Sequence, residues 1–191
     1  MLSYPPPNPP EEFTLIGEKD FSDWESLNDS IMGGASNASC RDTPSGLSLE
    51  GVLVEQGGGF VSCRSPVFIK SLDLSDFSGF VLEVEGEGRT LKFAVACTNR
   101  RFGIANFLAL NIRWVTELKT KKNGITRVEV PFSKLEPAVR AKPVKLPVRF
   151  DKSNISQFQL LHSKFGTPGK LNQAFQPGSI RIVLHSISAY F

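Results

Sequence analysis

Few side chains in this sequence could act as acids, bases or nucleophiles in catalysis. The 191 residues include only two histidines, His162 and His185. The segment Gly34–Ala38 (GASNA) lacks the second glycine of the G-x-S-x-G motif that presents a catalytic serine. Cys97 falls on the apolar parity of its expected strand and is predicted to lie in the core. The sequence therefore predicts no catalytic residue, and a protein that acts by binding.

The cysteines do not suggest cross-links or a metal site. Cys40, Cys63 and Cys97 are an odd number and have no C-x-x-C spacing. This pattern predicts neither a disulfide framework nor a zinc site, and it favours a reducing compartment.

Other metal and cofactor motifs are weak. A calcium site with oxygen ligands from Asp20, Asp23 or Asp29 stays open as an alternative. Residues 86–88 (GEG) are interpreted as a turn, because Leu91 stands where a dinucleotide fingerprint requires glycine. We expect no cofactor and no metal.

The best candidate for a binding site is the segment 24–36 (WESLNDSIMGGAS). An aromatic ring, an amide, a carboxylate and flexible glycines can together grip a sugar or a peptide backbone. In the alternative, Asn28 and Asp29 bond nearby amides as an Asx turn, while Trp24 and Met32 plug one end of the core. Arg64 is expected to anchor the loop through Asp29. The candidate binding residues of this region are Trp24, Asn28, Asp29, Met32, Gly33, Gly34, Ser36 and Arg64.

A second region mixes basic and aromatic residues. Arg100 and Arg101 precede an aromatic residue, and Arg113 precedes Trp114, as in proteins that bind single-stranded nucleic acid. Because no nucleic-acid-binding fold is recognisable, we favour a protein-binding rim or a solvated loop and expect no nucleic acid as a partner. Arg100, Arg101 and Trp114 are therefore candidate partner-binding residues.

The charges are unevenly distributed along the chain. Residues 1–90 contain 5 Lys or Arg and 15 Asp or Glu, whereas residues 91–191 contain 17 Lys or Arg and 4 Asp or Glu. Of the basic residues in the second half, 11 lie between 113 and 152. One interpretation is a basic face that meets an acidic partner or an anionic membrane. The other is that the two halves interleave in space, which would cancel the asymmetry.

Alternation of apolar and polar residues with period two dominates from Phe13 onward. It predicts strands at 47–54, 60–63, 67–69, 80–85, 91–97, 104–110, 126–132, 155–161 and 179–191. The 80–85 and 91–97 strands are expected to form a hairpin through a glycine-rich turn. Short strands separated by Gly, Pro, Asn and Ser predict an all-β fold, an antiparallel two-sheet β-sandwich of the jelly-roll type. A change of apolar parity between Leu184 and Ile187 predicts a β-bulge at His185 and Ser186.

The remaining segments set the expected domain organisation. Five prolines in residues 1–12 predict an extended arm, followed by one sandwich domain over 13–191. Segments 22–36, 134–150 and 162–178 are too long or unusual for simple turns, and three prolines argue against hairpin geometry in 134–150. No apolar run approaches the length of a membrane span and no signal-peptide pattern is present, so we expect a cytoplasmic protein.

Several motifs resemble those of the complex I intermediate-associated protein 30 family. Segment 24–36 is similar to its W-x-x-x-N-D-x-x-M-G-G-x-S signature, and 57–64 (GGGFVSCR) is similar to its G-G-F-x-S-x-R strand. Shorter resemblances follow in the same order at 72–79 (LDLSDFSG), 86–89 (GEGR, with Glu87 where the family usually has Asp), 130–132 (VPF) and 187–190 (ISAY). The resemblance covers roughly residues 20–191.

This resemblance implies a galactose-binding-like jelly roll, without known catalysis, that assists assembly of the NADH dehydrogenase membrane complex. Members without a mitochondrial address occur in bacteria and photosynthetic organisms, where a related bioenergetic complex is the natural client. The expected partners are protein subunits of a membrane complex under assembly, with peripheral contact to an anionic membrane surface. The alternative is a carbohydrate-binding module of the galactose-binding-like type, with a small carbohydrate as ligand.

Overall fold

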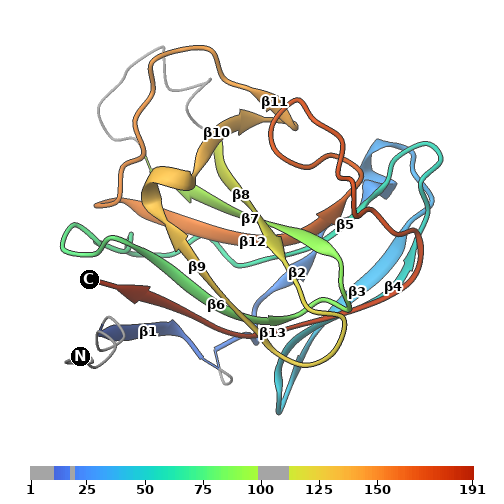
Figure 1. The fold of residues 1–191 in the computed structure, drawn as a ribbon, viewed down its shortest axis with the longest axis horizontal. Helices are drawn as coiled ribbons and strands as arrows, with labels where there is room; N and C mark the ends of the chain where they lie inside the picture. Colours follow the sequence, from blue (N-terminus) through green and yellow to red (C-terminus); the bar gives the residue numbers. More distant parts are fainter. Residues whose placement is uncertain (1–10, 18–19, 99–111) are drawn as a thin grey trace, which may run out of the picture.

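The computed structural model describes residues 11–17, 20–98 and 112–191, which form two antiparallel sheets stacked face to face (Figure 1). Two short 3-10 helices, η1 (Asp29–Met32) and η2 (Phe132–Lys134), interrupt the strands. The strands are β1 (Glu12–Ile16), β2 (Glu25–Ser26), β3 (Asn37–Thr43), β4 (Gly46–Leu53), β5 (Phe60–Arg64), β6 (Gly79–Glu85), β7 (Thr90–Cys97), β8 (Arg113–Lys119), β9 (Thr126–Pro131), β10 (Glu136–Val139), β11 (Lys142–Pro143), β12 (Ile155–Ser163) and β13 (Gly178–Tyr190).

The strands are divided between a six-stranded and a seven-stranded sheet. The first has the order β3-β4-β13-β6-β9, with β1 paired to β13, and the second has the order β11-β10-β8-β7-β12-β5-β2. Neighbours in each sheet are mostly distant in sequence, as in a jelly roll. The predicted all-β two-sheet sandwich is confirmed.

Alternate residues of each strand face the core between the sheets. In β7, Leu91, Phe93 and Val95 are fully buried in this core, so the intervening residues lie on the outer face of the sheet. Phe80 of β6 meets Phe93 and Phe158 of the opposite sheet at centroid distances of 5.4 and 5.5 Å. These edge-to-face contacts join the two sheets at the centre of the molecule.

The predicted hairpin between β6 and β7 is wrong. β6 pairs with β13 and β9 in one sheet, whereas β7 pairs with β12 and β8 in the other. The connecting turn carries positive φ angles at Glu87 (53°) and Gly88 (82°) and passes from one sheet to the other. Alternation shows which residues face the core, but it does not show which strand lies beside which.

The β-bulge in β13 is confirmed. Leu184 pairs with Val84 and Ser186 with Glu83, so His185 is the extra residue. On the other edge of β13, residues up to Leu184 pair with β4 and residues from Ile187 pair with β1. The bulge therefore lies where β13 exchanges one neighbouring strand for another.

Other strand predictions gave mixed results. The 67–69 segment forms no strand, and the predicted 104–110 strand and residues 1–10 of the predicted arm lie outside the described residues. Segment 134–150 contains a short hairpin of β10 and β11, contrary to expectation, with positive φ at Arg140 and Ala141 in its turn. Pro143 is tolerated in this hairpin because β11 is an edge strand.

The two halves of the chain interleave, so the charge asymmetry is partly cancelled. Ion pairs join Arg127 to Glu12, and Arg181 to Glu50 at 3.5 Å. The basic stretch 113–152 is itself divided, because β8 belongs to the seven-stranded sheet and β9 to the six-stranded sheet. Among the described residues, no helical segment has the length and hydropathy of a membrane span.

Candidate functional site

The 24–36 segment is organised by the buried carboxylate of Asp29, at the start of η1. Its two oxygens accept hydrogen bonds from the Ser36 amide (2.9 Å), the Ser36 hydroxyl (2.6 Å), and the amides of Gly59 (2.6 Å) and Phe60 (3.3 Å). Burial alone would raise the pKa of Asp29, but the Ser36 hydroxyl and these amides outweigh it and lower the pKa. The carboxylate is therefore ionised, and it ties segment 29–36 to the 57–60 turn.

Two glycines make room for this carboxylate. A Cβ added at Gly34 or at Gly58 would lie 2.4 Å from atoms of the Asp29 carboxylate group, closer than any side chain can approach. The Ser36 hydroxyl also accepts a hydrogen bond from the Val54 amide at 2.9 Å. Asp29, Gly34, Ser36 and Gly58 thus form one structural cluster, which we call the Asp29 cluster.

Asn28 and Trp24 support the structural interpretation of the loop. Asn28 Nδ2 donates to the Ala38 carbonyl at 2.8 Å. Trp24 is 7% exposed and packs edge-to-face on Phe21, with ring centroids 5.5 Å apart. Trp24 therefore plugs the core and offers no exposed face to a sugar ring.

Met32 behaves differently from the rest of the segment. It is 71% exposed and its neighbour Ile31 is 66% exposed, so the idea that Met32 plugs the core is wrong. Gly33, with φ of 85°, caps η1 beside them. The Asp29 cluster fixes a short turn that presents two apolar side chains to solvent.

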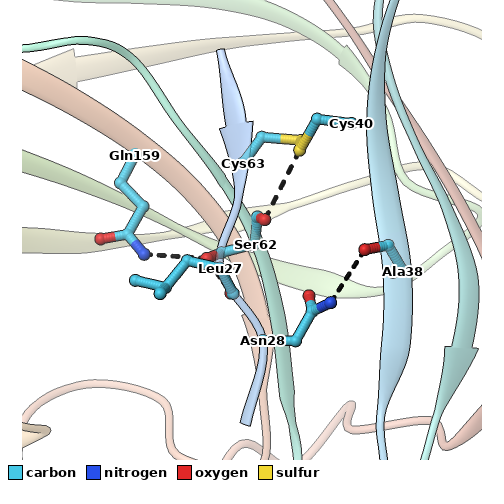
Figure 2. Close-up of a disulfide and its surroundings, with 7 residues drawn as sticks. All are labelled: Leu27, Asn28, Ala38, Cys40, Ser62, Cys63 and Gln159. Carbon is cyan, nitrogen blue, oxygen red and sulfur yellow. Dashed lines mark hydrogen bonds between the residues drawn. A yellow bond between two sulfur atoms is a disulfide. The ribbon is translucent and has the colours of Figure 1, made fainter. Parts of the chain in front are cut away.

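A disulfide beside this segment corrects the cysteine analysis. Cys40 in β3 and Cys63 in β5 are bonded, with Cα atoms 5.8 Å apart, and they join the edge of the six-stranded sheet to the seven-stranded sheet (Figure 2). The hydroxyl of Ser62, next to Cys63, donates to the Leu27 carbonyl at 2.5 Å and accepts from Gln159 Nε2 at 2.9 Å. The bond removes the basis for inferring a reducing compartment from the cysteines.

Arg64 does not anchor the loop. No hydrogen bond or ion pair joins it to Asp29, because Ser36 and two backbone amides already occupy the carboxylate. Arg64 lies on the outer face of the seven-stranded sheet, since the preceding residue, Cys63, faces the core. On the same face, Arg113 Nη2 donates to Gln157 Oε1 at 3.2 Å, and Gln157 Nε2 donates to the Ser65 carbonyl at 2.8 Å.

Lys92 is a residue of this outer face that the sequence analysis missed. It is 6% exposed, and burial lowers its pKa to about 8, although nearby Glu117 acts in the opposite direction. A lysine inside the near-continuous apolar run of β7 (TLKFAVAC) is the signal that could have identified it, because such runs are typical of strands covered on both faces.

The 163–177 segment borders an open cavity of about 840 Å³ on the edge of this face. Asn172 Nδ2 donates to the carbonyls of Thr90 (2.9 Å) and Ser163 (3.0 Å), and the Thr167 amide donates to Glu117 at 2.7 Å. These bonds hold the segment against β7 and β8. Its cavity walls combine Glu117 and Lys119 with polar side chains.

The histidines and the free cysteine are placed for structure. His162 is fully buried, and burial lowers its pKa to about 4. Its Nδ1 contacts the Thr90 carbonyl at 3.0 Å, and its Nε2 accepts a hydrogen bond from the Gln176 amide at 3.2 Å. It is therefore neutral, with Nδ1 carrying the proton. His185 contacts Glu85 at 2.9 Å, and burial raises the pKa of Cys97 to about 12. Both ring nitrogens of His162 are occupied and Cys97 stays a thiol, so neither is placed as a base or as an activated nucleophile.

Three candidates remain: the calcium site, Trp114, and the pair Arg100 and Arg101. Within the described ranges, no group of three His, Cys, Asp or Glu side chains could hold a metal ion, and the oxygens of Asp29 are already occupied by hydrogen-bond donors. Trp114 is 7% exposed and packs on Phe150 inside the sandwich. Arg100 and Arg101 lie outside the described residues.

Comparison with solved structures shows where this fold occurs. The family 11 carbohydrate-binding module of the cellulosomal cellulase Lic26A-Cel5E of Clostridium thermocellum matches with a TM-score of 0.66 and 14% identity, covering 96% of both chains. The same type of module in complex with a β-1,3-1,4-mixed-linked tetrasaccharide matches at 0.64 and 15% identity, over 94% of this chain and 95% of that chain. An agarase, AgWH50C, matches at 0.57 and 8% identity, over 94% of this chain and 24% of the agarase. These likenesses show a jelly-roll, galactose-binding-like fold.

Sequence comparison identifies the family. A search of curated proteins finds no match. The model of the complex I intermediate-associated protein 30 (CIA30) family matches residues 13–184, most of the chain and including the whole Asp29 cluster. The chain therefore belongs to the complex I intermediate-associated protein 30 family.

Proposed function

We propose that this protein is a non-catalytic assembly factor that holds subunits of a partly built membrane bioenergetic complex, of the NADH dehydrogenase type or a related photosynthetic complex. The observation that carries the proposal is the family match over residues 13–184. The positions of His162, His185 and Cys97 agree with a protein that binds rather than catalyses. A chaperone-like holder of this kind acts at the membrane surface, through peripheral contact.

The contact surface of the proposed holder includes the turn at Ile31 and Met32. Both side chains are more than 60% exposed, yet the turn below them is fixed by the Asp29 cluster. A rigid apolar projection loses little conformational entropy when it enters a pocket of a partner. Apolar anchors surrounded by polar residues are typical of protein interfaces.

The test is affinity purification of the tagged protein from native membranes, followed by identification of the co-eluting subunits. We expect NADH dehydrogenase subunits in incompletely assembled states, and a strong loss of them with the Ile31→Ser/Met32→Ser double variant. Val67 and Ile69 are exposed apolar residues at another site, so Val67→Ser/Ile69→Ser is the matched control. Recovery of glycans without subunits of a membrane complex would refute the proposal.

The second candidate function is a carbohydrate-binding module, which the fold shared with the tetrasaccharide-bound module favours. Sugar rings typically stack on exposed aromatic side chains. Trp24 and Trp114 are each only 7% exposed, which weighs against this candidate. Affinity electrophoresis in gels containing mixed-linked β-glucan tests it, since retardation of the protein would favour the carbohydrate function.

A further inference from the structure

The Cys40–Cys63 disulfide lies at the base of the loop 28–36, which carries the exposed apolar turn. One leg of this loop rests on β5. The Leu27 amide donates to the Ser62 carbonyl at 3.0 Å, and the Ser62 hydroxyl donates to the Leu27 carbonyl at 2.5 Å (Figure 2). Because Ser62 directly precedes Cys63, this leg is anchored one residue away from the disulfide.

The other leg of the loop rests on β3. Asn28 Nδ2 donates to the Ala38 carbonyl at 2.8 Å, two residues before Cys40 (Figure 2). Among the residues that the structure describes, the buried Oδ1 atom of Asn28 has no hydrogen-bond partner, so the position of this side chain depends on the bond to β3. The disulfide therefore sets the separation of the two strands that support the loop, one in each sheet.

Little else holds β3 against the opposite sheet. β3 is an edge strand whose neighbour in the sheet is β4, and of its seven residues only Ala38 is buried. Exposure increases along its inward-facing positions, from Ala38 through Cys40 to Asp42. Edge segments with few buried apolar contacts open locally at a low cost in free energy. Breaking the disulfide should therefore release β3 from β5 while the centre of the sandwich stays folded.

The same geometry exposes one sulfur of the bond to a reductant. Cys40 is partly exposed at the open edge of the sandwich, whereas Cys63 is 1% exposed. Exposed disulfides are the ones that act in regulation. The third cysteine, Cys97, is a free thiol, and burial raises its pKa to about 12. It therefore supplies no thiolate that could exchange with the disulfide.

We propose that the Cys40–Cys63 bond is a redox switch, opened by a dithiol protein of the thioredoxin type, that controls how firmly the loop 28–36 presents its apolar turn to the client. A thiolate of the dithiol attacks Cys40 Sγ and forms a mixed disulfide, while the Cys63 sulfur leaves with the electron pair and takes up a proton. The second thiol then loses its proton, attacks the mixed disulfide and releases Cys40, which takes up a proton in turn. Two electrons and two protons pass to the protein, and the dithiol becomes a disulfide. The inference rests on the proposed function and adds its regulation.

The oxidised protein is the form that binds the client more tightly. In the reduced protein, the Asp29 carboxylate still accepts the amides of Ser36, Gly59 and Phe60, but no covalent bond then keeps β3 beside β5. The apolar turn keeps its side chains and loses part of its rigidity. A mobile turn loses more conformational entropy on binding than a rigid one.

The first experiment asks whether the bond opens in the folded protein. The purified full chain is incubated at pH 7 with a thioredoxin-type dithiol protein, and its thiols are then alkylated in denaturant and counted by mass. We expect three thiols in place of one, with the far-UV circular dichroism of the untreated protein. Reduction that occurs only in urea concentrations that unfold the protein would show a purely structural bond and overturn the inference.

Backbone relaxation measured by NMR tests the loosening of the loop. In the oxidised protein, the order parameters of the amides at 31–33 should lie near the rigid value of about 0.85, and reduction should lower them toward about 0.6. Amides of the central pair β7 and β12 should keep rigid values in both states. Equal order parameters at 31–33 in the oxidised and reduced proteins would overturn the inference.

Capture from detergent-solubilised native membranes tests the effect on the client. We expect Cys40→Ser/Cys63→Ser to recover roughly tenfold fewer NADH dehydrogenase subunits than the oxidised native protein. Cys97→Ala, which removes the free thiol, should recover as many as the native protein. Native protein that has been reduced and then reoxidised should regain full capture, which a misfolded protein would not do.

The outcomes separate this inference from the proposed function. If the double variant and the reduced protein capture as many subunits as the oxidised protein, the switch fails and the assembly function stands. If the bond opens and the turn loosens, but no form of the protein captures subunits of a membrane complex, the redox control of the turn stands and the assembly function fails.

Discussion

Replacing Asp29 by asparagine tests the Asp29 cluster with almost no change of shape. One carboxylate oxygen accepts the Ser36 amide, and the other accepts the Gly59 and Phe60 amides and the Ser36 hydroxyl. Asparagine keeps one oxygen and presents an NH2 group in place of the other. In either orientation, at least one buried backbone N–H then faces another donor.

The expected cost follows from these bonds. A buried donor left without an acceptor costs about 1–3 kcal/mol, and the remaining bonds lose the strength that the negative charge gives them, about 1 kcal/mol more. We therefore expect Asp29→Asn to lower the free energy of unfolding at pH 7 by about 2–4 kcal/mol. For a chain of this length, the melting temperature should fall by roughly 5–15 °C.

Urea denaturation of both proteins at pH 7 and at pH 3 measures this effect. The lowered pKa of Asp29 contributes stability above the unfolded value of 3.8, which is lost as the pH falls through the folded pKa. The difference between the two proteins should therefore shrink in acid. Gly58→Ala, which drives a Cβ into the same carboxylate, should be comparably destabilising.

The matched control is Asp73→Asn. Asp73 also accepts bonds from an amide and a hydroxyl, both of Ser75, but it is exposed, so water replaces them. We expect no measurable change in its unfolding midpoint. Equal midpoints for Asp29→Asn and the native protein would show that the cluster does not stabilise the fold.

Three further changes should alter stability in defined directions. The double variant Cys40→Ser/Cys63→Ser lacks the cross-link between residues separated by 23 in the sequence. Its free energy of unfolding, measured by urea titration, should be lower by about 3 kcal/mol. A reductant should have the same effect on the native protein and none on the variant. The pKa of His162 is about 4 in the folded protein, against an ordinary value of 6.5. The free energy of unfolding should therefore fall as the pH drops from 6.5 to 4, by an amount on the order of 3 kcal/mol. If the His162→Gln protein lost stability equally steeply over this pH range, His162 would not be the group responsible. Lys92→Met should raise the melting temperature at pH 7, by an amount equivalent to about 2 kcal/mol. This gain should disappear near pH 10.5, because the penalty of the buried charge is lost as the pH rises above the folded pKa of about 8. Calorimetry that found the variant less stable than the native protein at pH 7 would exclude the penalty.

Much of the fold follows from alternation, because a strand packed on one side must place apolar residues at every second position. β6, β7, β9 and β12 were predicted close to their observed bounds on this basis. β3 (NASCRDT) was missed because it is an edge strand with few apolar residues. The bulge at His185 was visible because it shifts the alternation by one residue.

Pairing between distant elements was not predictable from local patterns. The Cys40–Cys63 bond requires that β3 and β5, which belong to different sheets, approach each other, and nothing in the spacing of the two cysteines indicates this. The Asp29 cluster was half predicted, since the Asx-type role of Asp29 was weighed, but its long-range partners Gly59 and Phe60 were not. Lys92 was missed because a strand buried on both faces has no polar parity to mark its outer side.

The way in which β13 is used has a consequence for folding. This single strand near the C-terminus pairs with β4, β6 and β1, which originate from the first half of the sequence. Ribosomes deliver the chain from its N-terminus, so β4 and β6 must wait, with one hydrogen-bonding edge open, until residues 178–190 have been made. Such long-range closure is slow and leaves the nascent molecule prone to aggregate, and removal of the last strand should yield an insoluble product rather than a smaller folded one.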